Sequence, residues 1–455
     1  MIQQLRTYLN TPTNAAPLVV FRLLFGVMMC FSIIRFWYHD WIDLLYIQPK
    51  FHFSFYGLEF IKPLGNYTYV LYAICFLAAF FVAIGFKYRI AIITFFLSFT
   101  YIELMDKTTY LNHYYFISVL SFLMIFLPAN SSFSVDSYRL KKAYKTIPNW
   151  TIDSIKLLLG IVYFYAGIAK LNSDWLFKAT PLKIWLPSKY DLPLIGETLM
   201  QQEWFHYAMS WSGMLYDVTI PFLLLYKRTR WFAFFFVVVF HVFTRILFPI
   251  GMFPFIMIVS TLIFFEANFH LKVIALIKRL LNQMFKLNHS IVLAENYSFT
   301  NKKLTVGVVA VFMLVQLVLP FRYLAYPNEL FWTEEGYRFS WRVMLMEKMG
   351  ISTFKIVNSK TGSYFYVDNK DFLTPLQEKQ MSFQPDFILE YAHYLGDHFT
   401  KQGHKNVEVY VQSYVALNGR PSQPYIDSKI DLYKEKESFK HKTWILPFND
   451  DIKGL

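Results

Sequence analysis

Ionisable residues interrupt several apolar stretches of this sequence, and six of them are the main cases that need an explanation, because such residues are costly there. They are Arg22, His113, Lys170, Asp217, His241 and Arg245. The sequence contains no HExxH, paired-cysteine, Walker or glycine-rich dinucleotide motif. It therefore gives no support for a metal site or for ATP or NAD chemistry, and acid–base chemistry by lysine and histidine is the chemistry to test.

Lys170 is the strongest candidate for a catalytic base. It closes the run GIVYFYAGIAK, in which apolar and aromatic side chains surround the amine for several turns. An apolar environment disfavours the charged ammonium form, and a neutral amine is able to accept a proton. The alternative interpretation is a lysine whose ammonium group reaches the membrane surface while its stem packs on apolar neighbours.

The other polar residues have structural alternatives as well. His113, in DKTTYLNH, would on its own more often be a hydrogen-bonded core histidine than a catalytic group. His241 and Arg245 lie four residues apart and are expected to form a supporting polar cluster within one apolar segment. Asp217 is expected to pair with one of the basic residues, because a buried carboxylate without a partner is unstable.

The elements that must position these residues are membrane spans. Apolar residues make up 55% of the 455 residues and charged residues 16%, against roughly 25% charged residues in soluble proteins. Nine segments are apolar over about the length that a span needs, roughly 20 residues. They are 17–38, 68–86, 89–105, 110–128, 151–170, 205–226, 231–248, 250–265 and 304–324.

Lysine and arginine in the connections predict the orientation of these spans. With the N-terminus in the cytoplasm, the connections rich in basic residues all fall on the inside, and nine spans place the C-terminal part outside. The inside connections contain Lys87 and Arg89; Arg139, Lys141, Lys142 and Lys145; Lys227, Arg228 and Arg230; Lys272, Lys278, Arg279, Lys286, Lys302 and Lys303. These loops account for much of the net charge of +13, so nucleic-acid binding is not expected.

The ends and the cysteines add two expectations. Cys30 and Cys75 both lie in apolar runs, so neither a disulfide framework nor a cysteine-based metal site is expected. The N-terminal residues lack the short apolar core and the cleavage site of a signal peptide, so the first span is expected to stay in the protein.

The fold predicted is a mainly α polytopic transmembrane bundle with a C-terminal α+β soluble domain. The bundle covers 1–265, a cytoplasmic amphipathic connector 266–303, the last span 304–324 and the outer domain 325–455. In the outer domain, STFKIV and SYFYV predict a hairpin across a glycine-containing turn. QPDFILEYAHYLGDHFTKQG predicts a helix and NVEVYVQSYVAL a strand.

This topology places two candidate residues at the same depth. The fourth span begins outside and the fifth ends outside, so His113 and Lys170 both lie near the outer face, where the soluble domain caps the bundle. A base at this boundary is accessible to an apolar substrate from the bilayer and to a polar substrate from outside.

Long stretches of the chain resemble the vitamin K-dependent γ-glutamyl carboxylase family. The resemblance runs in the same order over nearly the whole chain. The stretches are FRLLFG (21–26), DKTTYLNHYY (106–115), YFYAGIAKLNSDW (163–175), LYDVTIPFLLL (215–225), HVFTRILFPIGMF (241–253), FWTEEGYRFSW (331–341), NGRPSQPYIDSKIDL (418–432) and TWILPF (443–448).

The resemblance implies an activity. The lysine at the position of Lys170 deprotonates vitamin K hydroquinone of the phylloquinone or menaquinone type, and its oxygenation by O2 to the epoxide drives removal of a glutamate γ-proton. The carbanion then takes up CO2, and the residue at the position of His113 serves this carboxylation step. The segment that holds the glutamate contains Trp332, Tyr337, Ser340 and Trp341. The implied partners are a glutamate-containing protein or peptide, the lipid bilayer and a quinone-reducing enzyme.

The sequence also departs from the animal enzymes. Met346 stands where they have a glutamate-contacting histidine, and Leu186 where they have an arginine, with Lys183 and Lys189 the nearest cations. Their C-terminal extension and membrane-to-lumen disulfide have no counterpart here. A bacterial-type member in the cell membrane is therefore expected. Two alternatives stay open: a quinol-epoxidising relative with weak or different carboxylation, and a non-enzymatic membrane transport or binding protein.

Overall fold

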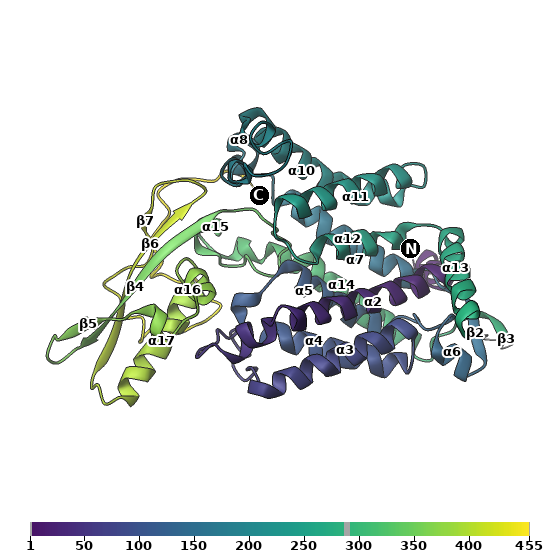
Figure 1. Cartoon of the computed structure of the whole chain (residues 1–455), viewed down its shortest axis with the longest axis horizontal. Helices are drawn as coiled ribbons and strands as arrows, with labels where there is room; N and C mark the ends of the chain where they lie inside the picture. The colour runs from purple at the N-terminus through teal and green to yellow at the C-terminus, as the bar shows by residue number, and fades with distance from the viewer. Residues whose placement is uncertain (1, 286–291, 455) are drawn as a thin grey trace.

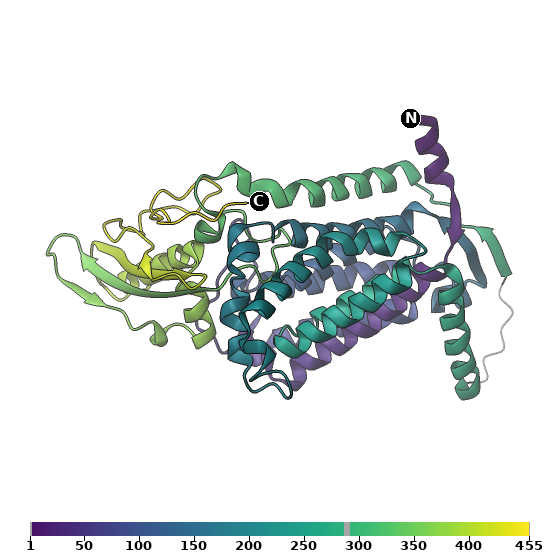
Figure 2. The same cartoon turned by 90° about the horizontal axis from the view of Figure 1, so that it is seen from above.

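The computed structural model describes residues 2–285 and 292–454. A bundle of long helices and a smaller domain of strands and short helices lie end to end along the longest axis (Figures 1 and 2). Both termini lie beside the bundle in the second view, the N-terminus toward the end remote from the small domain. The predicted combination of a mainly helical bundle with a C-terminal α+β region is confirmed.

Six helical segments of the described residues are long and apolar enough to cross a membrane. They correspond to six of the nine predicted spans, and they make the chain an integral membrane protein. They are α2 (Ala16–Tyr38), α3 (Thr68–Ile84) with the preceding turn, α7 (Trp150–Ile168), α10 (Glu203–Leu225), α11 (Arg230–Leu247) and α14 (Lys302–Val318) with the following turn.

The predicted count of nine spans is not confirmed. Segments 89–105, 110–128 and 250–265 form α4 (Tyr88–Leu104), α5 (Asn112–Ile125) and α12 (Phe253–Thr261), which have 17, 14 and 9 residues. A helix of 17 residues is only about 26 Å long at 1.5 Å per residue, less than a hydrocarbon layer of about 30 Å. The count reaches seven if α12 and the sharply bent helix after it form one span.

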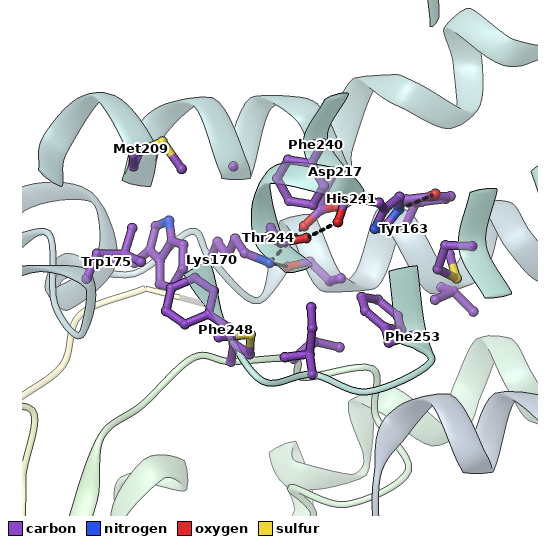
Figure 3. A pocket seen from close by; sticks show the side chains of 18 of the residues that line it. Tyr163, Lys170, Trp175, Met209, Asp217, Phe240, His241, Thr244, Phe248 and Phe253 are labelled. Atoms are coloured by element: carbon purple, nitrogen blue, oxygen red, sulfur yellow. Dashed lines mark hydrogen bonds and ion pairs between the residues drawn. The ribbon is translucent and has the colours of Figure 1, made fainter. Parts of the chain in front are cut away.

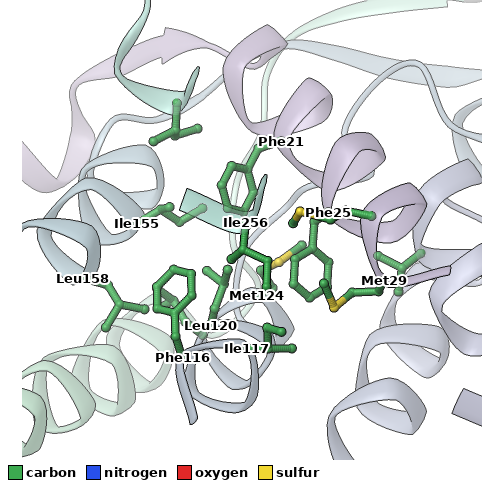
Figure 4. Close-up of a cluster of buried hydrophobic side chains, with 14 of the residues drawn as sticks. Phe21, Phe25, Met29, Phe116, Ile117, Leu120, Met124, Ile155, Leu158 and Ile256 are labelled. Carbon is green, nitrogen blue, oxygen red and sulfur yellow. The ribbon is translucent and has the colours of Figure 1, made fainter. Parts of the chain in front are cut away.

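The core of the bundle is apolar and is built by helices distant in sequence. Side chains from α2, α5, α7 and α12 interlock there (Figure 4). The residues drawn include Phe21, Phe25, Met29, Phe116, Ile117, Leu120, Met124, Ile155, Leu158 and Ile256. Gly26 lets α2 approach α3 closely, since a Cβ atom there would lie 2.5 Å from the backbone nitrogen of Ala83. The short helices α5 and α12 are therefore held inside the bundle by packing.

The end of the bundle remote from the small domain carries a small sheet and a helix. The strands β1 (Pro12–Asn14), β2 (Lys142–Pro148) and β3 (Val292–Asn296) form a sheet in that order. The predicted amphipathic connector contains helix α13 (Ala267–Phe285), which runs across the direction of the bundle helices (Figure 2). Lys286, one of the predicted inside basic residues, lies outside the described residues.

The C-terminal domain is a four-stranded antiparallel sheet covered by helices. The strand order is β5-β4-β6-β7, and β4 pairs with β6 from Lys348↔Leu417 to Asn358↔Val407. Its elements are α15 (Leu330–Thr333), β4 (Lys348–Asn358), β5 (Tyr364–Tyr366), α16 (Pro375–Met381), α17 (Pro385–Lys401), β6 (Val407–Leu417) and β7 (Gln423–Pro424). The predicted hairpin, helix and strand are β4–β5, α17 and β6, and all three predictions are confirmed.

An arginine clamp joins the C-terminal domain to the short helices between α7 and α10. These are α8 (Ser173–Lys178) and α9 (Leu182–Trp185). Arg420 donates to both carboxylate oxygens of Asp174 at 2.6 and 2.7 Å, and Asn418 donates to the same group at 2.9 Å. A bidentate pair of this kind fixes direction as well as distance. The loop after β6 therefore fixes the segment that directly follows Lys170.

Gly167 sets the distance between α7 and α10. A Cβ atom at this position would lie 2.6 Å from Val218 Cγ2 and 2.7 Å from its backbone nitrogen. We expect Gly167→Ala to destabilise the protein by about 1–3 kcal/mol, the usual cost of overpacking, and to lower its melting temperature in detergent. Gly160→Ala on the same helix is the matched control, because its Cβ would lie an ordinary 3.9 Å from Pro221. Equal melting temperatures for the two variants would contradict this role of Gly167.

Candidate active site

Lys170 follows the last turn of α7 and forms an ion pair inside the protein. Its Nζ donates to Asp217 Oδ2 at 2.8 Å and to the carbonyl oxygen of Ala166 at 3.0 Å (Figure 3). The ring of Trp175 lies 5.3 Å from the same nitrogen. Both side chains of the pair are less than a tenth exposed. The expected pairing of Asp217 with a basic residue is therefore seen, and its partner is Lys170.

This pair lies on the wall of a cavity of about 90 Å³, which we call the lysine chamber. Apolar and aromatic side chains form most of its wall, and the polar ones gather on one side of the view (Figure 3). The lining residues are Val162, Tyr163, Ala166, Lys170, Trp175, Leu182, Trp185, Met209, Gly213, Asp217, Phe240, His241, Thr244, Phe248, Ile250, Phe253, Met257, Val343 and Met344. Such a lining, with few polar groups, is typical of sites for flat apolar ligands.

The structure separates the two residues of the predicted polar cluster on α11. His241 is buried in the lysine chamber, where its Nε2 lies 3.0 Å from the hydroxyl of Tyr163. Arg245 is exposed and is not among the residues that line the chamber. The spacing of four residues predicted that His241 and Arg245 share one face of α11. Arg245 lies outside the chamber because a guanidinium is more stable in water or at a membrane surface than against an apolar wall. Of the expected cluster of Asp217, His241 and Arg245, only Asp217 and His241 line the lysine chamber, where they lie with Lys170.

His113 lies in the first turn of α5 and faces a second, larger cavity of about 610 Å³. We call this cavity the histidine cleft. His113 is buried, and its Nε2 has no hydrogen-bond partner in the structure. Residues of the C-terminal domain line the cleft together with residues of the bundle. Its polar and charged lining residues include Arg35, Lys107, Asn112, Glu334, Tyr337, Arg338, Gln380 and Gln384.

One thin wall separates the two cavities. Ile250, Phe253, Val343 and Met344 line both of them. The ring centre of Phe253 lies 6.0 Å from that of His113 and 5.5 Å from that of His241. Lys170 and His113 therefore face different cavities that meet at this wall, an arrangement that the sequence did not reveal.

Of the four predicted substrate-binding residues, only Tyr337 lines the histidine cleft. Trp332 is buried in the C-terminal domain, where its Nε1 donates to the carbonyl oxygen of Leu446 at 2.7 Å. Trp341 packs on Tyr115 of the bundle, with ring centres 4.8 Å apart. The hydroxyl of Ser340 donates to the carbonyl oxygen of Tyr337. These three residues anchor the segment that presents Tyr337.

The residues that differ from those of the animal enzymes lie in different parts of the structure. Met346 lines the histidine cleft, so an apolar thioether stands where the resemblance predicts an imidazole. Leu186 is fully buried in the hydrophobic core of the C-terminal half. Lys183 is exposed and pairs with Glu203, and neither it nor Lys189 lines the two cavities. Neither of these two lysines therefore takes the place of the expected arginine in the cavities.

The sequence analysis missed a charged cluster that joins the bundle to the C-terminal domain. Lys107 Nζ lies 2.8 Å from Asp386 Oδ2 and 3.2 Å from Glu390 Oε2. Arg338 approaches both oxygens of Asp386, at 2.7 and 3.2 Å. Lys107 and Arg338 stand in the motifs DKTTY and GYRFSW, but nothing in the sequence pairs them with α17, about 50 residues or more away. The cluster fixes one rim of the histidine cleft.

The carboxylates of this cluster differ in their protonation. Burial alone would raise the pKa of Asp386, but Arg338 and Lys107 hold that pKa well below its usual range. Burial raises the pKa of Glu390 to about 7, although Lys107 lies close to its carboxylate. Asp386 is therefore ionised throughout the neutral range, whereas Glu390 gains or loses its proton within it.

Two protein-family profiles match the chain. The profile described as HTTM domain matches residues 10–269. The profile described as vitamin K-dependent gamma-carboxylase, lumenal domain, matches residues 301–451. No solved structure matches the chain. The first match covers more than half of the chain, and the second covers the domain that supplies Tyr337 and Arg338.

The raised pKa of Glu390 predicts that the stability of the docked domain depends on pH. Because the folded protein binds this proton more tightly than the unfolded chain does, the stabilisation is present at low pH and is lost as pH rises through about 7. We expect the melting temperature of the wild type to fall by a few degrees between pH 5.5 and pH 8. Glu390→Gln should remove this part of the dependence.

The exposed carboxylate of Glu197 provides the matched control, and Glu197→Gln should keep the wild-type dependence. His52 contacts Asp106 at 3.0 Å near this cluster in both proteins, so only the difference between the wild type and Glu390→Gln is diagnostic. Parallel pH curves for the wild type and Glu390→Gln would contradict the assignment.

Proposed function

Since the chain belongs to the vitamin K-dependent gamma-carboxylase family, we propose that it is a γ-glutamyl carboxylase that couples oxidation of vitamin K hydroquinone to carboxylation of protein glutamate. The observation that carries this proposal is the ion pair of Lys170 and Asp217 on the wall of an apolar cavity. The two family profiles support the substrate class, and the two adjoining cavities support a reaction with two substrates.

The lysine chamber fits a hydroquinone. The flat apolar ring of such a molecule matches the aromatic and aliphatic lining, and a ring hydroxyl needs a polar partner at one point of the wall. Lys170, Asp217 and His241 supply polar groups at that point. When bound, the hydroquinone is oxidised by O2 to the epoxide and supplies the base that removes a glutamate γ-proton.

We assign the first proton transfer to Lys170. The amine becomes neutral once the ammonium of the resting ion pair has released its proton to the solvent. It then takes the proton of a ring hydroxyl, and the carboxylate of Asp217, 2.8 Å away, stabilises the ammonium that forms. The carbonyl oxygen of Ala166 accepts a second hydrogen bond and fixes the direction of Nζ. Asp217 thus orients the base and balances its charge, much as a carboxylate orients the histidine of a catalytic triad.

The histidine cleft receives the glutamate in this proposal. It combines polar groups from the bundle and from the C-terminal domain, so a peptide segment is able to enter between the two parts. We assign the carboxylation step to His113, whose Nε2 has no protein partner, and substrate positioning to Tyr337. The γ-carbanion of the glutamate reacts with CO2, and γ-carboxyglutamate is the product.

We further propose the orientation that the sequence predicts. The N-terminus lies in the cytoplasm of a bacterial cell, and the C-terminal domain lies on the outer side, where exported glutamate-containing proteins are available. The basic connections lie at the end of the bundle opposite to that domain, in agreement with this orientation (Figure 2). A quinone-reducing enzyme regenerates the hydroquinone, which is of the menaquinone or phylloquinone type.

The proposed base is tested with the purified full chain in detergent. Given vitamin K hydroquinone, oxygen, labelled bicarbonate and a glutamate-containing peptide, the wild type should form epoxide and fix label into the peptide. Lys170→Ala should lower both products by at least about 100-fold, the range of general-base catalysis. Epoxide without fixed label in the wild type would favour a relative that oxidises the quinol only, and neither product would favour a binding protein.

Lys170→Arg is the matched variant for this test. It keeps a cation beside Asp217, so the buried carboxylate is not left without a partner. A guanidinium does not deprotonate in proteins, so both products should still be lost while the melting temperature stays near that of the wild type. Full epoxide formation by either variant would remove Lys170 from the role of base.

His113→Ala should separate the two halves of the reaction. Because His113 faces the histidine cleft and not the lysine chamber, we expect label fixation to fall by at least about tenfold while epoxide formation falls much less. The measurement is the ratio of fixed label to epoxide at saturating peptide. An unchanged ratio would show that His113 does not act on the glutamate half.

A further inference from the structure

The charged residues that line the histidine cleft are paired with one exception. Lys107 pairs with Asp386 and Glu390, Arg338 pairs with Asp386, and Glu334 accepts from Lys348 at 2.9 Å. Within residues 2–285 and 292–454, the structure shows no carboxylate within ion-pair distance of Arg35, and the side chain of Arg35 hydrogen-bonds the uncharged hydroxyl of Tyr114. Its Nε is buried and has no partner. A guanidinium in this state needs an anion or water.

The side chain of Arg35 lies at the wall between the two cavities. The guanidinium lies over the ring of Trp41, 5.0 Å from its centre, and beside the hydroxyl of Tyr114. A Cβ atom on Gly251 would lie 3.3 Å from its Nη2, so the absence of a side chain there makes room for it. Gly251 directly follows Ile250 and comes two residues before Phe253, and both of these residues line both cavities.

His113 faces the same cleft and is sensitive to the charge of Arg35. The cation therefore lies close to the residue to which we assign the carboxylation step. Trp41 and Gly251 hold it without neutralising it, since a ring face and a backbone turn carry no formal charge. A fixed and unneutralised cation at this point is suited to bind an anionic group of a substrate.

The glutamate half of the reaction builds up negative charge that such a cation would stabilise. The γ C–H bond breaks, its proton goes to the base, and its electron pair spreads onto the oxygens of a carboxylate that is already negative. The new C–C bond to CO2 then moves this charge onto a second carboxylate. A preorganised cation next to oxygens on which charge develops is among the strongest catalytic devices of proteins.

Resting on the proposed function, we propose that Arg35 binds the side-chain carboxylate of the substrate glutamate at the wall shared by the two cavities and stabilises the charge that develops there. The glutamate then lies with its γ-carbon toward the wall at Ile250 and Phe253, beyond which the lysine chamber begins. Arg35 is thus a catalytic residue of the glutamate half and takes no part in proton abstraction by Lys170.

The experiment pairs two peptides with two proteins. One peptide carries glutamate at the acceptor position, and the other carries glutamine as a competitive inhibitor without the negative charge. For the wild type we expect the glutamine peptide to bind at least about tenfold more weakly than the glutamate peptide. For Arg35→Gln we expect the two affinities to become equal and label fixation per epoxide to fall roughly 100-fold, with Arg35→Lys restoring part of both.

Arg139→Gln is the control, because it removes an exposed guanidinium at the opposite end of the bundle. It should keep the preference for glutamate and the ratio of products. A merely structural role for Arg35 predicts that Arg35→Gln weakens both peptides equally and lowers the melting temperature, and this result would overturn the proposal. A raised KM for CO2 with an unchanged preference for glutamate would also overturn it.

The failure of this proposal is distinguishable from the failure of the proposed function. If the wild type fixes no label into any glutamate peptide, the function itself is wrong. If the wild type fixes label and Arg35→Gln does so with the same KM for peptide and the same ratio to epoxide, only the role of Arg35 is wrong.

Discussion

An ammonium and a carboxylate removed from water together are stable only when they meet at hydrogen-bond distance, and Lys170 and Asp217 do so at 2.8 Å within an apolar wall. Much of the architecture keeps them there. Gly167 permits α7 and α10 to approach, and the segment that follows Lys170 is held by Arg420 through Asp174. A base with its own counterion accepts a proton without leaving a lone charge in a low-dielectric site, which is the constraint that any proton transfer inside a membrane must meet.

The proposed reaction sets a second constraint, because two substrates of opposite character must react without mixing their environments. The lysine chamber is apolar and is lined mainly by the bundle, with Val343 and Met344 from the segment before β4, whereas the histidine cleft carries more polar and charged side chains and needs the C-terminal domain to complete it. The cluster of Lys107, Arg338 and Asp386 therefore matters because it positions a polar rim against an apolar wall. A bundle without this docked domain would lose the cleft and also these two residues of the chamber wall.

The sequence predicted the parts of this structure that depend on local pattern. Apolar runs located six long helices, alternation located β4 and β6, and the cost of burying charge pointed to Lys170, Asp217 and His241. Its count of nine spans is not confirmed, because an apolar segment such as 110–128 resembles a span in sequence but forms a helix of only 14 residues, α5, that is buried by packing. It also placed Trp332 and Trp341 at the substrate, whereas both are packing residues. Contacts such as Lys107 with Glu390 join distant segments, and periodicity carries no information about them.

The thin wall between the cavities defines the remaining physical problem. Ile250, Phe253, Val343 and Met344 come from two distant segments, one in the bundle and one leading to β4. In the proposed reaction, a reactive base formed on one side must reach a glutamate on the other while water stays excluded, because water would quench it. An apolar wall meets both needs if substrate binding shifts it. The segment from Trp341 to Lys348 contributes Val343 and Met344 to this wall and is anchored at both ends by buried aromatic and ionic contacts, so a peptide bound in the cleft would act on the wall through this segment.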